Sequence, residues 1–278
     1  MTDPTTDPTA LSDDQLRALV AERQWYHTFE LRPGVTTPGW FDLRAFADTL
    51  PWPDLRGKRC LDIGTFEGFW AYQLEDRGAA EVVAVDILDP RAWDWPYGSE
   101  AHVVQALEDR KQGGSGFELV SALRGSAVQR QECSIYDLSP DKVGTFDVVY
   151  LGSLLLHLRD PVRALEAVRS VMNPGGRLIS CDAVDLDLTY LHPRRPVAHL
   201  DGVGRPWWWK CNPAGLKRLV EVGGFRVLSG PQRVFLPIGA GQVLGKLRPS
   251  RLLTPVGREL IAMHRKGDPH AWVLAEPR

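Results

Sequence analysis

A glycine-containing turn and two carboxylates are the residues of this sequence best suited to bind a nucleotide. The turn contains Asp62, Gly64, Thr65, Phe66 and Gly68. Its glycines let a ligand approach the backbone closely, at the start of a helix whose N–H groups point outward. Asp86 ends the next apolar run, roughly twenty residues further on, where a carboxylate can accept hydrogen bonds from both hydroxyls of a ribose. Together these residues predict a nucleotide-binding site.

Phe66 decides between two kinds of nucleotide. A dinucleotide-binding turn has a glycine at that position, because the pyrophosphate must lie against the backbone. S-adenosylmethionine (SAM) carries no phosphate, so its turn tolerates a side chain there. Asp62, before the first glycine, suits a ligand with an amine that is oriented through the loop. The turn therefore favours SAM, and a nicotinamide-dependent oxidoreductase is the disfavoured alternative.

Two histidines and a tyrosine are candidates for catalysis. Methyl transfer depends mainly on positioning, and it needs a base only when the acceptor must lose a proton. His157 follows the fourth expected strand and is the first candidate; the alternative is that it caps the next helix or is buried. His27 and Tyr26 lie in an aromatic arm that could fold over the cofactor as a lid, or could simply anchor the arm.

Tryptophans supply the candidate acceptor-binding residues. Trp207, Trp208 and Trp209 are consecutive, so in a strand at least one indole would face solvent or ligand. With Trp95 they could form an aromatic wall for a flat acceptor; the alternative is a clamp that packs an insertion onto the domain. His192, His199 and Asp201 fit no metal-ligand spacing, and we expect no metal.

These residues must be positioned by alternating strands and helices. We expect seven strands, at 59–63, 81–86, 130–134, 145–151, 177–181, 226–236 and 270–275. Helices are expected over 68–77, from Pro161 to before Asn173, and over 213–222. This order predicts a Rossmann-like, doubly wound α/β fold with a mainly parallel seven-stranded sheet.

The rest of the chain is expected to surround one domain, residues 58–278. Residues 1–10 are predicted to be a disordered tail, and 11–57 an N-terminal helical arm or lid with helices from Ser12 to about Arg23 and over 41–50. Three insertions are expected, at 89–126, 183–212 and 237–266. Ligands bind at the carboxyl ends of the strands in such sheets, so these insertions should shape access to the site.

The order of motifs resembles class I SAM-dependent methyltransferases. The resemblance rests on Asp62-Ile63-Gly64, on Asp86, on the strand Phe146-Asp147-Val148-Val149 and on Asn173-Pro174-Gly175-Gly176 before the fifth strand. It implies a methyltransferase enzyme with SAM as its cofactor.

A narrower resemblance covers residues 24–236. Trp25-Tyr26-His27, the segment 54–57, Ile135-Tyr136-Asp137-Leu138 and the segment 155–161 are similar to the tRNA wobble-uridine (carboxy)methyltransferase family. That family implies a set of residues around the cofactor: Trp40, Arg44, Gly64, Asp86, Ile87, Leu88, Ile135, Tyr136 and Gly152.

Two positions depart from that family. Its carboxymethyl-transferring members hold the extra carboxylate of their cofactor with a lysine and a tyrosine, where this chain has His27 and Leu156. Leucine donates no hydrogen bond, and a neutral histidine is a poor substitute for an ammonium. Plain SAM is therefore the expected cofactor.

The net charge and composition of the chain restrict the kinds of acceptor and cellular setting that we expect. The net charge of −2 argues against a surface built mainly to grip nucleic acid. Four separated cysteines, no membrane-length apolar run and no signal-peptide pattern suit a cytoplasmic protein. We expect a small-molecule acceptor of an aromatic or natural-product-like kind. The alternatives are a tRNA wobble uridine and a non-catalytic SAM-binding protein; no membrane partner is expected, and the sequence makes no prediction of oligomeric state.

Overall fold

The computed structural model describes residues 7–99, 101–200, 202–247, 250 and 254–278. Within them lies a seven-stranded sheet in the order β12-β13-β9-β8-β5-β6-β7. Its strands, in chain order, are β5 (Arg59–Ile63), β6 (Glu81–Asp86), β7 (Gln129–Glu132), β8 (Phe146–Gly152), β9 (Met172–Ala183), β12 (Phe225–Leu236) and β13 (Asp268–Pro277). β5 to β9 are mutually parallel, whereas β13 runs antiparallel to both neighbours. The predicted fold class and its seven strands are confirmed, with β7 beginning and ending earlier than expected.

The central strands β5, β6 and β8 are buried on both faces, and alternate side chains point into different apolar clusters. Val82 and Ala84 of β6 join one apolar cluster, and Val83 and Val85 join the other. The helices and short helical turns outside the N-terminal arm are α2 (Phe69–Asp76), η3 (Pro90–Ala92), α3 (Ala101–Lys111), η4 (Gln112–Gly114), α4 (Ser115–Arg124), η5 (Ile135–Asp137), α5 (Pro140–Val143), η6 (Leu155–His157), α6 (Pro161–Ser170), α7 (Leu186–Leu191), α8 (Pro213–Val222) and α9 (Pro255–Arg265). As expected, Asp160 caps α6 through the Arg163 N–H, with Pro161 at its first position.

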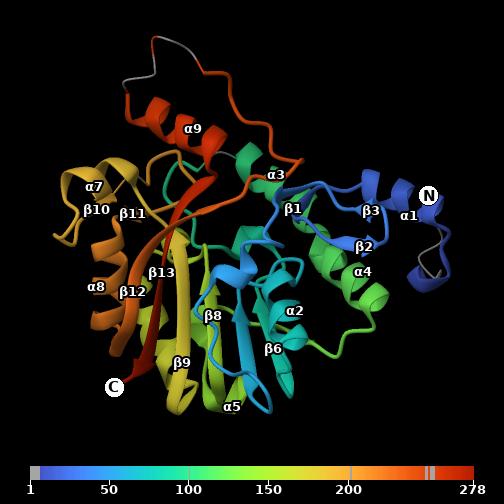
Figure 1. The fold of residues 1–278 in the computed structure, drawn as a ribbon, viewed down its shortest axis with the longest axis horizontal. Helices are drawn as coiled ribbons and strands as arrows, with labels where there is room; N and C mark the ends of the chain where they lie inside the picture. The colour runs from blue at the N-terminus through green and yellow to red at the C-terminus, as the bar shows by residue number, and fades with distance from the viewer. Residues whose placement is uncertain (1–6, 100, 201, 248–249, 251–253) are drawn as a thin grey trace.

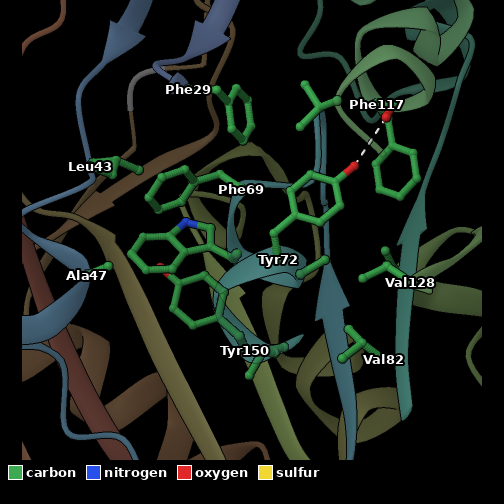
Figure 2. Packing of buried hydrophobic residues seen from close by; sticks show 14 of the residues in the cluster. Phe29, Leu43, Ala47, Phe69, Tyr72, Val82, Phe117, Val128 and Tyr150 are labelled. Carbon is green, nitrogen blue, oxygen red and sulfur yellow. Dashed lines mark hydrogen bonds between the residues drawn. The ribbon is translucent and has the colours of Figure 1, made fainter. Parts of the chain in front are cut away.

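Aromatic side chains fill the cluster between α2 and the N-terminal arm (Figure 2). The rings of Trp70 and Tyr150 stack with centroids 4.3 Å apart. The Tyr72 hydroxyl donates to the Phe117 carbonyl at 3.1 Å, which ties α2 to α4. The helix that follows the glycine turn is therefore held rigidly from two sides.

The N-terminal arm is built mainly of short strands. It contains η1 (Pro8–Ala10), α1 (Asp13–Ala21), β1 (Trp25–His27), β2 (Glu30–Arg32), β3 (Val35–Thr36), β4 (Gly39–Phe41) and η2 (Ala47–Thr49). α1 has the predicted Ser12 cap, completed by Gln15. The predicted helix over 41–50 is wrong: Phe41 pairs with His27 in a parallel ladder, and the Asp42 carboxylate accepts the Arg44 N–H. This local turn competes with helix formation, although the apolar residues of the segment are still buried.

Part of each expected insertion lies at one end of the sheet, whereas α4 of the segment 89–126 packs beside α2 (Figure 1). Figure 1 shows α3, α7 and α9 beyond the upper ends of the strands, where β5, β6, β8 and β9 finish. The segment 183–212 also holds a small antiparallel pair, β10 (Ala198–Leu200) and β11 (Trp209–Cys211). Residues 1–6 of the expected tail 1–10 lie outside the described residues. The remainder of that tail contains η1, and Arg32 donates to the carbonyls of Pro8 and Thr9 within it. In the described part of the chain no helix is long and apolar enough to cross a membrane.

Candidate functional site

The turn between β5 and α2 has an unusual backbone. Gly64, Phe66 and Gly68 have φ angles of 76°, 53° and 92°, in the left-handed region. At Gly68 a Cβ would lie 2.7 Å from the Tyr72 ring and 2.8 Å from the Phe117 ring, so only glycine fits. The Gly64 and Thr65 N–H groups both donate to the Val85 carbonyl of β6. The turn is thereby fixed against the end of the neighbouring strand.

Asp86 lies at that strand end and is nearly buried. Its Oδ2 accepts the Phe66 N–H at 2.8 Å, and its Oδ1 accepts the Ile87 N–H at 2.8 Å. The Lys111 Nζ lies 2.6 Å from Oδ2. The predicted residues Phe66, Asp86 and Ile87 are therefore brought together, and Lys111 joins them from the end of α3.

Lys111 is a residue that the sequence analysis missed. It is 3% exposed, and its ammonium lies 4.9 Å from the ring centroid of Phe66 and 5.0 Å from that of Trp93. The Trp93 indole donates to the Ile87 carbonyl at 3.3 Å. A lysine in a long insertion carries no local signal of burial, so its role depends on how α3 packs over the sheet. Nearby, the Leu88 N–H donates to Glu132 at 3.4 Å.

Asp62 is buried inside β5, one strand away from Asp86. Burial raises the pKa of its carboxyl to about 7, against hydrogen bonds from Thr65 and the Ala71 N–H that favour the charged form. The Ala71 N–H lies 3.1 Å from Oδ2, in the first turns of α2. Asp62 therefore links the strand to the helix on either side of the glycine turn.

Glu67, also missed from sequence, fastens the arm to this turn. Its carboxylate accepts the Tyr26 N–H at 2.8 Å and the His27 N–H at 3.3 Å, and it pairs with His27 Nδ1 at 2.9 Å. His27 is buried and its ring stacks on Phe69 with centroids 5.6 Å apart. The histidine predicted as a catalytic candidate thus already has a buried partner, the Glu67 carboxylate.

Tyr26 lies over the turn. Its ring stacks on Phe66 with centroids 5.0 Å apart, and burial raises the pKa of its hydroxyl. Trp40 is tilted against Tyr26 at 6.0 Å, and the Arg110 guanidinium lies 3.5 Å from the Trp40 ring centroid. By contrast, Arg44 is exposed and paired with Asp42 within the arm.

Ile135 and Tyr136 follow β7. Ile135 is buried, and the Tyr136 hydroxyl donates to Asp94 Oδ2 at 2.8 Å and accepts the Asp160 N–H at 3.0 Å. Gly152 ends β8, where a Cβ would lie 2.6 Å from the Tyr150 ring. Asp94, in the insertion 89–126, is thus hydrogen-bonded to Tyr136, which follows the end of β7.

His157 and the tryptophans tie the insertions together. The Nδ1 of His157 donates to the Pro206 carbonyl at 2.5 Å, and burial lowers the pKa of the imidazole. The neutral ring therefore carries its proton on Nδ1 and its lone pair on Nε2. The Trp208 indole donates to the Asp94 carbonyl at 2.6 Å, and the Trp95 indole to the Pro90 carbonyl at 2.7 Å. Trp207 lies between two cations, with Arg205 at 5.6 Å and Lys210 at 4.8 Å from its ring. Trp209 is half-buried in β11.

A surface hollow of about 600 Å³ lies along the edge of the sheet rather than over the glycine turn. It is lined by Ile87, Glu132, Cys133, Ser134 and Val143, among others. Ile87 is the residue that it shares with the predicted cofactor set.

Comparisons with known proteins identify relatives of this chain. A family model described as a methyltransferase domain matches residues 39–229. The chain is 29% identical to a ubiquinone biosynthesis O-methyltransferase of Neisseria meningitidis serogroup C, over 50% of each chain. It is 25% identical to a tRNA U34 carboxymethyltransferase of Campylobacter hominis, over 54% of this chain and 45% of the relative. The chain thus spans about half the length of these curated relatives.

One solved structure matches nearly the whole fold. The N-terminal domain of EvdMO1, in the presence of SAH and D-fucose, aligns with a TM-score of 0.54 at 16% identity, over 96% of this chain and 98% of that domain. At that identity the likeness concerns the fold alone.

Proposed function

Since this chain belongs to the methyltransferase domain family, we propose that it transfers a methyl group from SAM to a small-molecule acceptor. The family and the fold agree with the methyltransferase expected from the motifs, and SAM is the donor that those motifs favoured. The acceptor is the part of the proposal that needs its own argument.

The residues around Asp86 fit SAM. A buried carboxylate at the end of β6 suits a ribose diol, and the Phe66 and Ile87 N–H groups hold it in place. In this proposal the cofactor lies against Asp62, Gly64, Thr65, Phe66 and Gly68 of the turn, with Ile87, Leu88, Ile135, Tyr136 and Gly152 around it. When bound, SAM supplies an activated methyl group.

Plain SAM fits better than a carboxylated form. His27 already faces the Glu67 carboxylate at 2.9 Å, so a second carboxylate there would meet a like charge. Leu156 is buried and apolar, and its carbonyl accepts the Trp208 N–H. Neither position offers a cation or a hydroxyl to an additional carboxylate.

The single observation that carries the small-molecule acceptor is the cover over Asp86. Lys111 covers Asp86 from α3, while from the arm Tyr26 stacks on Phe66, the residue whose N–H Asp86 accepts, and Trp40 is tilted against Tyr26. A site covered in this way by aromatic side chains suits a small, partly flat molecule better than a folded RNA. The relative that acts on tRNA U34 keeps the RNA acceptor as the second candidate.

Labelled methyl transfer tests the acceptor. Purified full-length chain is first titrated by calorimetry with SAM, carboxy-SAM and NADH, and we expect SAM to bind most tightly. It is then incubated with methyl-labelled SAM and separate panels of phenols, catechols, amines and bulk tRNA. We expect the label to appear in a small molecule. Label in tRNA alone would show that the acceptor is tRNA and not a small molecule. Binding of NADH without SAM would overturn the methyltransferase itself, and SAM binding with no transfer would favour a non-catalytic SAM-binding protein.

A further inference from the structure

Ser153, His270 and Asp268 form a hydrogen-bonded series at the carboxyl end of the sheet. Ser153 directly follows β8, and its Oγ lies 2.9 Å from Nε2 of His270, near the start of β13. The Nδ1 of His270 lies 3.3 Å from the Asp268 carbonyl and 3.3 Å from Asp268 Oδ2. His270 is 1% exposed. Residues more than a hundred positions apart thus place a hydroxyl (Ser153), an imidazole (His270) and a carboxylate (Asp268) in a row.

The partners of the imidazole define its tautomer. Nδ1 faces two oxygen acceptors, so it carries the proton, and Nε2 accepts from the Ser153 hydroxyl. Burial lowers the pKa of His270 to about 3 and raises that of Asp268 to about 6. Near neutral pH the series therefore has a neutral imidazole between a hydroxyl and a carboxylate.

Ser153 occupies a backbone position that favours glycine. Its φ is 50°, and within the described residues only Phe66 and Gln112 are other non-glycine residues with positive φ. The next residue, Leu154, packs on the cofactor turn: a Cβ on Gly64 would lie 3.2 Å from Leu154 Cδ2. The half-buried Ser153 hydroxyl is therefore one residue away from the turn assigned to SAM.

The N–H groups around Ser153 exclude acyl transfer by this serine. An acyl-transfer site needs donors aimed at a developing oxyanion. Here the Ser153 N–H donates to the Cys181 carbonyl at 2.8 Å, and the Leu154 and Leu155 N–H groups donate to Asp182 at 3.0 and 2.7 Å. Because the N–H groups of Ser153, Leu154 and Leu155 are already engaged, they cannot stabilise an oxyanion at Ser153. The series is suited to moving a proton instead.

We propose that Ser153 takes the proton of the acceptor's hydroxyl or N–H group and passes its own proton to His270, with Asp268 as the positioning residue for the imidazole. The inference rests on the proposed function. As the acceptor's lone pair forms the bond to the methyl carbon, the electrons of the carbon–sulfur bond stay on sulfur. The acceptor proton moves to Ser153 Oγ as the Ser153 proton moves to His270 Nε2, and the ionised Asp268 carboxylate stabilises the imidazolium. After the methylated product has left, the proton returns from Nε2 to solvent through the hydroxyl of the half-buried Ser153.

Charges on the surrounding elements bear on this transfer. Lys210 of β11 lowers the pKa of both His270 and Asp268, and it is paired with Glu259 of α9 at 2.6 Å. Glu259 raises the pKa of Asp268. Asp182 of β9 holds the backbone beside Ser153, and Tyr26 of β1 faces Asp268 and Asp182 closely enough that both raise the pKa of its hydroxyl. Asp268 is the carboxylate that meets the imidazolium, and its protonation below about pH 6 would slow the transfer.

The decisive variant is Ser153→Gly, because glycine accepts the φ of this position while removing the hydroxyl. With an acceptor found in the labelled-SAM panel, we expect S153G to keep its melting temperature and its calorimetric Kd for SAM, and to lose about 10²- to 10⁴-fold in kcat. Ser180→Ala is the matched control: it removes a buried hydroxyl of β9 outside the series, and its kcat should stay within twofold of the wild type. Asp268→Asn should remove the fall in kcat near pH 6.

Nitrogen-15 NMR of His270 in the free protein gives a readout independent of turnover. We expect a neutral, Nδ1-protonated imidazole whose Nε2 resonance shifts in S153G and not in S180A. An Nε2-protonated ring, or an S153G variant with undiminished kcat on an acceptor that the wild type methylates, overturns the relay alone. A wild type that binds SAM and methylates no acceptor overturns the proposed function and the relay with it.

Discussion

Asp86 shows how a single side chain acquires its setting from three parts of the chain. Its carboxylate is held by the turn residue Phe66, by its neighbour Ile87 and by Lys111 of α3. Burying a carboxylate is costly unless it is paired and hydrogen-bonded, and Asp86 has two backbone N–H donors and a lysine as partners. An ionised carboxylate is the form that accepts hydrogen bonds from a ribose diol.

Replacing Asp86 with alanine should weaken SAM binding at least about 100-fold. Two hydrogen bonds to a charged group are each worth roughly 1.5 to 3 kcal/mol, and 1.4 kcal/mol is tenfold in affinity. Isothermal titration calorimetry with SAM measures the change. Because D86A leaves the Lys111 ammonium unpaired, the double variant D86A/K111M is needed as a control for folding. Unchanged affinity in both variants would show that SAM is not held at the end of β6.

At the scale of elements, the arm and the insertions close the carboxyl end of the sheet by different means. The arm meets the glycine turn through Glu67, which accepts two consecutive backbone N–H groups of β1, and it meets the segment after β12 through backbone hydrogen bonds such as that from the Gly239 N–H to the Trp40 carbonyl. The insertions are fastened through Asp94, which binds Tyr136, Arg159 and the Trp208 indole. Glu67 and Asp94 thus each bring together contacts from more than one segment at this end of the sheet.

Glu67→Ala should loosen β1 and the strands around it while the sheet stays folded. The variant loses the acceptor for the Tyr26 and His27 N–H groups and leaves His27 without its carboxylate, at a cost of about 3 kcal/mol. Hydrogen–deuterium exchange should show faster exchange of residues 25–41 and little change in β5 or β8. Asp42→Asn is the matched control in the same arm, since its ion pair with Arg44 is partly exposed and worth about 1 kcal/mol or less. Equal protection of the arm in E67A and the wild type would contradict this anchoring.

At the scale of the whole molecule, buried carboxyls govern how stability responds to pH. Burial raises the pKa values of Asp62 and Asp182 to about 7 and that of Asp268 to about 6. In the unfolded chain these groups lose their protons near pH 4. Their contribution to stability is therefore fully present below about pH 4 and is lost as pH rises to 7. His270 acts in the opposite direction: its lowered pKa makes its contribution present above about pH 6.5 and lost in acid.

Asp182→Asn should flatten the loss of stability between pH 5 and 7. Each carboxyl that is protonated in the folded state and ionised in the unfolded state changes the unfolding free energy by at most about 1.4 kcal/mol per pH unit. Urea unfolding at pH 5, 6 and 7 measures the slope. Asp187→Asn is the control, because Arg258 lowers the pKa of Asp187 and places its effect below this window. A D182N slope equal to that of the wild type would contradict the raised pKa.

The strands and their succession along the chain were predictable, because each strand has an apolar run or a flanking signal within its own segment. Apolar runs such as Glu81–Asp86 and the Asp160-Pro161 helix start are local signals, and the structure has them in place. The segment 41–50 was mistaken for a helix because its apolar spacing serves strand pairing and a turn instead. Lys111, Glu67 and the Ser153–His270 pair carry no such signal, since each acquires its partner from a distant segment.

The sequence by itself determined the sheet, the glycine turn, Asp86 and the methyltransferase family, because these follow from periodicity and short motifs within single elements. Only the tertiary structure decided what surrounds them. It paired His27 with Glu67, directed His157 to the Pro206 carbonyl, placed Lys111 on Asp86 and aligned Ser153 with His270 and Asp268. The physical reason is that a hydrogen bond or an ion pair depends on distances of about 3 Å between atoms. Such distances are set by packing between elements that the order of residues does not encode locally.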